Sequence, residues 1–177
     1  MIACARLEDI APIQSPTGRY SVSVKLVPAK DLGREVEDST LPNAKVAVVC
    51  LRDAHKEKDL HSIVVPDAED TDHRNSVSLS WSPDGRILEI QVQIGQLSDF
   101  SLYRIVSDKL VKIEELSIPK KLVVEPAHPK SRGGAYIEKW TGNDTFVAVD
   151  TIADAEYTYR ITKEWKSEVV ASRPKDE

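Results

Sequence analysis

The chain has 177 residues, 41% of them hydrophobic and 30% charged, and its 24 basic and 29 acidic residues leave a net charge of −5. This negative balance disfavours a general affinity for nucleic acid or for an anionic membrane surface. No apolar run approaches the roughly 20 residues that a membrane-spanning helix needs. We therefore expect one globular domain over residues 1–177, large enough for a core of its own.

The N-terminus leaves two localisations open. Met1-Ile2-Ala3-Cys4 is far shorter than a signal peptide, which favours a cytoplasmic start. Ile-Ala-Cys also resembles the end of a bacterial lipobox, and in that alternative Cys4 is the lipid anchor of a periplasmic protein and its only membrane contact. Cys50 lies in an apolar run and is predicted to be a buried, inert thiol. A Cys4–Cys50 disulfide is the alternative in an oxidising compartment.

The first 65 residues predict a series of strands and a turn. β-branched and aromatic residues are plentiful, and helical periodicity is hard to find, as in all-β proteins. Strands are expected over residues 3–13, 20–26, 45–52 and 61–65. The segment 15–19, Ser-Pro-Thr-Gly-Arg, has the residues of a tight turn. Residues 28–43 are polar and predict a long loop, whereas 45–52 is nearly continuous in apolar residues and predicts a strand buried on both faces.

The segment 67–72 concentrates acidic side chains. Carboxylate oxygens are preferred ligands of Ca²⁺, and Asp70 and Asp72 are the candidate metal ligands. The segment lacks the glycine and the terminal glutamate of a calcium loop, so a solvated acidic turn is the alternative. His55 and His61 flank a charged turn and are expected at the surface, because no third ligand is spaced to join them. No cofactor is predicted.

The clearest pattern in the chain is a hairpin over residues 76–94. Its first strand alternates polar and apolar residues, and the turn 82–85, Ser-Pro-Asp-Gly, follows. The second strand then places four apolar residues on one face: Leu88, Ile90, Val92 and Ile94. The opposite face carries Glu89, Gln91 and Gln93 and is expected to meet water or a partner.

The hairpin, from Ser80 to Ile90, resembles the blade motif of TolB-like and WD40-like β-propellers, in which the turn joins the first two strands of a four-stranded blade. Weaker copies lie on both sides of it. Residues 15–19 repeat Ser-Pro-x-Gly-Arg, and Trp140 precedes a third turn over 141–144 as Trp81 precedes the central one. Both tryptophans are expected to anchor the core. The resemblance implies three blade-like units, over about 3–65, 76–116 and 135–171.

The apolar positions of the three units do not share one phase. Counted from the turn, those of the strand after Arg19 are shifted by one residue from Leu88 and Ile90. Because such a shift moves every side chain to the other face, a bulge or a different turn is expected in the first unit. In the third unit, Val147 and Val149 keep the phase of Leu88 and Ile90.

The second half of the chain predicts further strands and a connector. Strands are expected over residues 100–106, 110–116, 135–140, 146–150, 158–161 and 165–171, with an edge strand at 122–124. In the connector, Lys130 and Arg132 are candidate ligands for an anion or an acidic partner, with a solvated loop as the alternative. Trp165, set between Glu164 and Lys166, is the candidate for an exposed binding contact.

We predict an all-β protein of antiparallel, four-stranded blade-like units, arranged as a twisted sheet, a sandwich or a partial propeller. Propellers typically close with four to eight blades, so three units are too few for a ring. Either two copies complete a ring as a homodimer, or the units form a self-contained sheet protein.

The leading functional hypothesis is a non-catalytic interaction protein that binds a protein partner through its sheet faces or the loops 28–43 and 67–75. The sequence contains no nucleophile elbow, phosphate-binding loop or His-Glu-x-x-His motif. The resemblance and the lipobox imply a partner or inhibitor protein of the bacterial cell envelope. The alternative is a hydrolase whose site combines scattered carboxylates with His73 or His128.

Overall fold

The computed structural model describes residues 5–6, 10–28, 31–32, 45–69, 75–124 and 133–175. These ranges contain fourteen strands and the short 3-10 helix η3 (Lys120–Leu122), and no α-helix. Nor do they contain a helix with the length and apolar character needed to cross a membrane. The predicted all-β class is confirmed.

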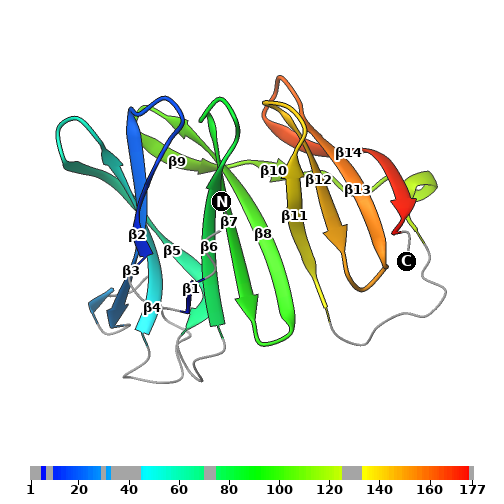
Figure 1. Cartoon of the computed structure of the whole chain (residues 1–177), viewed down its shortest axis with the longest axis horizontal. Coiled ribbons are helices and arrows are strands. Elements are labelled where there is room, and N and C mark those ends of the chain that lie inside the picture. Colours follow the sequence, from blue (N-terminus) through cyan, green and yellow to red (C-terminus); the bar gives the residue numbers. More distant parts are fainter. Residues whose placement is uncertain are drawn as a thin grey trace.

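The strands form three sheets that follow one another along the molecule (Figure 1). The first sheet contains, in spatial order, β2 (Ile10–Gln14), β3 (Tyr20–Pro28), β4 (Lys45–Asp53) and β5 (Lys58–Glu69). The central sheet contains β1 (Ala5–Arg6), β6 (Asn75–Trp81), β7 (Ile87–Ile94), β8 (Leu97–Val106) and β9 (Lys109–Lys112). The third sheet contains β10 (Glu114–Glu115), β14 (Lys166–Pro174), β13 (Ala155–Ile161), β12 (Thr145–Asp150) and β11 (Ala135–Trp140). Each sheet has four consecutive antiparallel strands, as the blade-like units predict.

Several predicted strands are assigned differently. The single strand expected over 3–13 is two strands, and β1 pairs with β6 of the central sheet, not with the first sheet. The strand expected over 61–65 extends over Lys58–Glu69 and includes Pro66. A proline is tolerated there because β5 is the edge of its sheet. The edge strand expected at 122–124 is absent from the described residues, and η3 occupies its start.

Two hydrophobic cores hold the three sheets face to face. Between the first and central sheets, ten buried residues pack together: Val22, Val24, Ala47, Val49, Leu51, Val65, Val77, Leu88, Ile90 and Leu110. Between the central and third sheets the buried residues include Ile87, Phe100, Leu102, Ile137, Phe146, Tyr157, Tyr159 and Val169. The central sheet therefore buries both of its faces, as a blade does between two neighbours. Trp81 packs against the first core and Trp140 against the second, as predicted.

The first two turns are equivalent in geometry. Gly18 donates its N–H to the carbonyl of Ser15 at 2.8 Å, and Gly85 donates to Ser82 at 2.9 Å. Both glycines adopt a left-handed φ, 71° and 70°, which other residues reach only with strain. The turns also touch, since a Cβ on Gly85 would lie 3.0 Å from Cδ of Pro16. The repeat of Ser-Pro-x-Gly thus places two matching turns side by side.

The phase shift between the first two units reflects which face each sheet buries. Tyr20 and Ile87 occupy the same position after their turns, because each donates its N–H to Oγ of the turn serine, at 3.2 and 3.0 Å. Val22 is therefore equivalent to Glu89, and each faces the next sheet along the chain. Leu88 instead faces the preceding sheet. Of the two expected alternatives, the different turn is wrong, and register irregularities do occur in the first unit, in β2 between Ile10 and Ile13 and twice along the β4–β5 pair.

The third unit also differs from its prediction. Phe146 and Ala148, not Val147 and Val149, belong to the core that faces the central sheet. The reason is a different turn, in which the N–H groups of Thr141 and Gly142 both donate to the carbonyl of Thr145, at 2.9 and 3.1 Å.

The polar face of the central hairpin is covered, which contradicts the prediction for Glu89. This residue is 6% exposed and adjoins a cavity of about 210 Å³ that is lined on the other side by Ile137 and Trp140 of β11. Burial raises the pKa of its carboxyl group. Ser80 Oγ donates a hydrogen bond to the carboxylate at 2.5 Å, and this bond opposes the rise in pKa. The nearby Trp140 indole also opposes the rise, although its N–H does not reach hydrogen-bond geometry. Only Gln93 at the far end of this face is exposed.

Glu89→Gln is expected to stabilise the protein increasingly as the pH rises. The raised pKa means that Glu89 keeps a proton in the folded protein at pH values at which the unfolded chain has released it. The free energy of unfolding of the wild type therefore decreases as the pH rises from the pKa of Glu89 in the unfolded chain to its pKa in the folded protein. Glutamine stays neutral and still accepts the Ser80 hydrogen bond. Urea denaturation of both proteins from about pH 4 to about pH 8 measures the difference. Glu138→Gln replaces an exposed glutamate of β11 and serves as the control; a pH-independent difference for Glu89→Gln would contradict the prediction.

Cys50 is 7% exposed, so its predicted burial is confirmed. Burial raises the pKa of its thiol, which lowers the thiolate fraction on which reactivity depends. Cys50 has a free thiol, so the alternative of a Cys4–Cys50 disulfide is wrong for this structure. Cys4 lies outside the described residues, and the lipid anchor stays a prediction.

Candidate functional site

A cleft opens where the chain passes from the central sheet to the third. β9 pairs with only four residues of β8, Tyr103 to Val106. One further backbone hydrogen bond follows, from the Ile113 N–H to the Leu102 carbonyl at 2.8 Å. The next two residues form β10, which pairs in parallel with β14. The strand predicted over 110–116 is therefore divided between two sheets. The part of β8 that precedes Leu102 therefore has no neighbouring strand on the side of β9, and a cavity of about 420 Å³ lies there.

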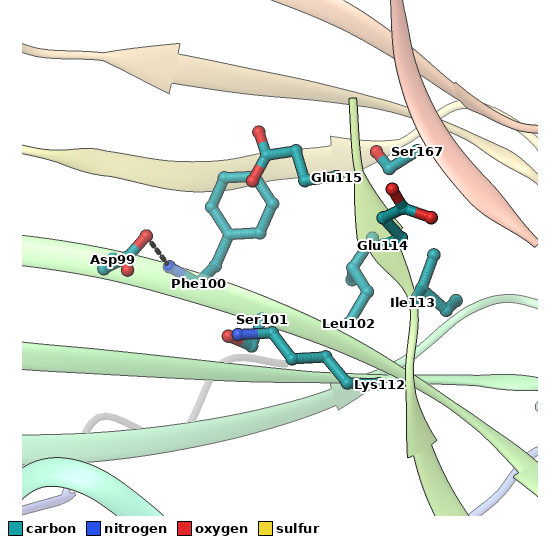
Figure 2. A pocket seen from close by; sticks show the side chains of 9 residues that line it. All are labelled: Asp99, Phe100, Ser101, Leu102, Lys112, Ile113, Glu114, Glu115 and Ser167. Carbon is teal, nitrogen blue, oxygen red and sulfur yellow. Dashed lines mark hydrogen bonds between the residues drawn. The ribbon is translucent and has the colours of Figure 1, made fainter. Parts of the chain in front are cut away.

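We call this cavity the β8–β10 cleft. Its lining combines charged, polar and apolar side chains: Asp99, Phe100, Ser101, Leu102, Lys112, Ile113, Glu114, Glu115 and Ser167 (Figure 2). They come from β8, β9, β10 and β14, and from the Ile113 link between β9 and β10. The cleft thus depends on both the central and the third sheet.

The carboxylates of the cleft differ in their partners. Glu114 pairs with Nζ of Lys166 at 3.0 Å. Asp99 accepts a hydrogen bond from the Phe100 N–H at 2.8 Å, and Glu115 accepts one from the Tyr159 hydroxyl at 3.3 Å. Among the described residues, neither Asp99 nor Glu115 has a basic group within the 4.0 Å of an ion pair. Of the three carboxylates, Glu114 alone therefore has an ion-pair partner among the described residues.

Ser167 places a hydroxyl group in the wall of the cleft. It is 3% exposed, and its Oγ has no hydrogen-bond partner. Its backbone is fixed, because Ser167 is in register with Glu115 and its carbonyl accepts the Leu116 N–H at 2.8 Å. An unpaired buried hydroxyl costs roughly 1–3 kcal/mol. A group that bonds to Ser167 would recover part of that cost.

Glu115 of the cleft and its partner Tyr159 both have raised pKa values. Glu115 is exposed as a residue, but partial burial of its carboxyl group raises its pKa, and the charge of Asp99 raises it further. The Tyr159 hydroxyl and Lys112 oppose that rise. Burial first, and then the charge of Glu115, raise the pKa of Tyr159 well above its ordinary range. Tyr159 is thus a hydroxyl donor at neutral pH.

An apolar hollow adjoins the cleft across β8. Its volume is about 390 Å³, and Asp99, Phe100, Ser101 and Lys112 line both spaces. The rest of its lining is mainly apolar: Val65, Ile90, Val92, Ile94, Leu97, Ser98 and Tyr103. A ligand that carries both a polar group and an apolar part would find both environments here.

Trp165 is the predicted site residue that the structure describes. It is partly buried against the second core, and the guanidinium groups of Arg86 and Arg104 lie 5.9 and 5.0 Å from its ring centre. Its φ of 60° is left-handed, in a turn where its N–H donates to the Thr162 carbonyl at 3.0 Å. These contacts join the third sheet to the central one, and a ligand contact at Trp165 stays a prediction.

The other predicted ligands fall outside the described residues. These are Lys130 and Arg132 for an anion, and Asp70 and Asp72 for a metal ion. Within the described ranges, no group of three or more histidine, cysteine, aspartate or glutamate side chains is arranged to hold a metal. The loops 28–43 and 67–75 also lie largely outside these ranges.

The β8–β10 cleft was not predicted from the sequence. Its one local signal is the pair Glu114-Glu115, which interrupts an apolar alternation between Leu110 and Leu116. In the sequence these two acids resemble the solvated end of a strand. Their function as a bridge between sheets depends on Ser167, more than fifty residues later, and has no local pattern.

Comparisons with known proteins add a distant structural likeness. No family model matches the chain, and no curated protein is similar to it in sequence. A crystal structure of a protein from Lactobacillus plantarum, determined by structural genomics, has a TM-score of 0.43 and 12% identity. The match covers 96% of this chain and 42% of that protein, so the chain spans less than half of its length.

The class of protein follows from the architecture itself. Three antiparallel sheets packed face to face, with the central one buried on both sides, make this an all-β, β-propeller-like protein.

Proposed function

We propose that the protein is a non-catalytic binding protein and that its ligand or partner group occupies the β8–β10 cleft. The observation that carries the proposal is the buried, unpaired hydroxyl of Ser167 in the cleft wall. The unpaired charges of Asp99 and Glu115 and the adjoining apolar hollow support it. Buried polar groups are normally satisfied, and an unsatisfied one in a concave wall favours a site for a partner group.

The chemistry of the cleft favours binding over catalysis. A serine nucleophile needs a base within hydrogen-bond reach, and Ser167 has none among the described residues. Among the described residues that line the cleft there is no histidine or cysteine. The alternative hydrolase stays a prediction, because His73 and His128 lie outside the described ranges.

We propose a protein partner, within the bacterial cell envelope, on the sequence resemblance alone. A periplasmic location and a lipid anchor at Cys4 belong to the same proposal. Completion of a ring by a second copy remains the competing arrangement, and the molar mass in solution separates it from a monomer of 19.7 kDa.

Nuclear magnetic resonance of the ¹⁵N-labelled full chain tests the binding function. Small cationic, anionic, neutral aliphatic and sugar probes are added one class at a time. At least one class is expected to shift the amide signals of Phe100, Ile113 and Ser167, while the probe's own spectrum stays unchanged. The absence of shifts at these amides with every class would refute the binding site, and chemical conversion of a probe would refute its non-catalytic nature.

A further inference from the structure

We infer that the β8–β10 cleft binds an ammonium or guanidinium group. Such a group is carried by a lysine or arginine side chain of a partner protein or by a small organic amine. The inference rests on the proposed function, since it takes the cleft as the binding site and names the chemistry of what enters it.

The charges of the cleft select a cation. Among the described residues, Asp99, Glu114 and Glu115 line it together with one basic residue, Lys112. Lys166 neutralises Glu114 at 3.0 Å. Three carboxylates thus lie against two ammonium groups, and one negative charge stays uncompensated. An anionic ligand would add to this repulsion, whereas a single positive charge would balance it.

The unused hydrogen-bonding capacity of the cleft consists mainly of acceptors. Asp99 uses Oδ1 for the Phe100 N–H, and Glu115 uses Oε1 for Tyr159, so the second oxygen of each carboxylate has no partner among the described residues. Oγ of Ser167 is unpaired as well. An ammonium group offers three donors and a guanidinium group five, which suits three separate acceptors.

An organic cation fits this site better than a metal ion. Within the described part of the chain, no three carboxylate, imidazole or thiolate groups gather at the spacing of metal ligands. Phe100, Leu102 and Ile113 instead add an apolar wall to the carboxylates. Lysine and arginine have the matching form, with a charged head on a methylene stem that packs on apolar surface.

Titrations of the full chain test this selectivity. The cationic probes are n-butylammonium and n-butylguanidinium, and butyrate and n-butanol are controls of the same length. Backbone-blocked lysine and arginine represent side chains of a polypeptide. The two cations are expected to shift the cleft amides at millimolar concentrations at which butyrate and butanol do not. Tighter binding of the blocked amino acids identifies a protein side chain as the source, and tighter binding of the simple cations identifies a small amine.

Variants locate the effect in the cleft. Glu115→Gln is expected to weaken binding about tenfold, since it removes a charge-assisted hydrogen bond. Asp99→Asn, at an exposed carboxylate, is expected to weaken it about threefold. Glu138→Gln on β11 removes an acid outside the cleft and is expected to leave the affinity unchanged. Retained amide spectra show that each variant is folded.

Two results would overturn the inference. Binding of butyrate or butanol as tight as that of the cations would exclude charge selectivity, and equal affinity of Glu115→Gln, Asp99→Asn and the wild type would exclude the cleft carboxylates. Either result leaves the proposed function intact if another class of probe binds there. A cleft that no probe of any charge occupies refutes the proposed function as well.

Discussion

Gly134→Ala is expected to lower the free energy of unfolding by at least about 3 kcal/mol, the upper range for overpacking. A Cβ at this position would lie 1.8 Å from the carbonyl oxygen of Ser98 and 2.6 Å from its nitrogen. Both are backbone atoms of β8, so no flexible side chain can move aside. Gly134 is itself fixed, because its N–H donates to Oγ1 of Thr151 at 2.9 Å and its carbonyl accepts the Thr151 N–H at 3.0 Å. The clash is relieved only if the third sheet shifts away from the central one.

Urea denaturation followed by tryptophan fluorescence and far-ultraviolet circular dichroism measures this loss. Gly142→Ala is the matched control, because its added Cβ would meet nothing nearer than Thr145, at 3.8 Å. A change within about 0.5 kcal/mol is expected for the control. The same small change in Gly134→Ala would show that β8 and the start of β11 are not in close contact.

Phe146→Ala is expected to cost about 4 kcal/mol, within the range for removal of a buried phenylalanine ring. Phe146 is fully buried, with 0% exposure. Its ring stacks on Tyr159 at 4.9 Å between centres and 3° between planes, and meets Phe100 edge-on at 5.9 Å and 88°. Phe146 and Tyr159 belong to the third sheet and Phe100 to the central one. Because hydrogen-bonded strands hold these rings, the cavity left by the substitution cannot collapse fully.

Equilibrium unfolding of Phe146→Ala and of Val170→Ala provides the comparison. Val170 is 41% exposed on β14, and its truncation is expected to cost less than about 1 kcal/mol. A double-mutant cycle with Phe100→Leu and Phe146→Leu then measures the aromatic contact between the sheets. Its expected coupling is at least about 0.5 kcal/mol. Additive effects in the cycle would contradict the packing of the central sheet on the third.

Local features of the fold were predictable because they depend on neighbouring residues. The central hairpin has the alternation and turn residues of its final structure, with Gly85 at a left-handed φ of 70°. The apolar run 45–52 is buried on both faces as β4, from Val46 to Leu51. Burial of Cys50 follows from the same run. In each case the pattern and the structure lie within about ten residues of one another.

The predictions were wrong about which sheet two short strands belong to. Ala5–Arg6 joins the central sheet, and Glu114–Glu115 joins the third. Both segments are two residues long, too short for a periodicity of their own. The polar face of Glu89 also required tertiary information, since a buried carboxyl paired with Ser80 and an exposed one have the same alternation.

Local sequence patterns were sufficient to predict the all-β class, a tight turn at each of Gly18 and Gly85 and the number of four-stranded units, because alternation and turn chemistry act within one hairpin. The buried face of each sheet and the position of the β8–β10 cleft were visible only in the folded molecule. The reason is that sheet faces and sheet partners depend on packing between strands far apart in the chain. The contact of Gly134 with Ser98 and the register of Glu115 with Ser167 are both of this kind.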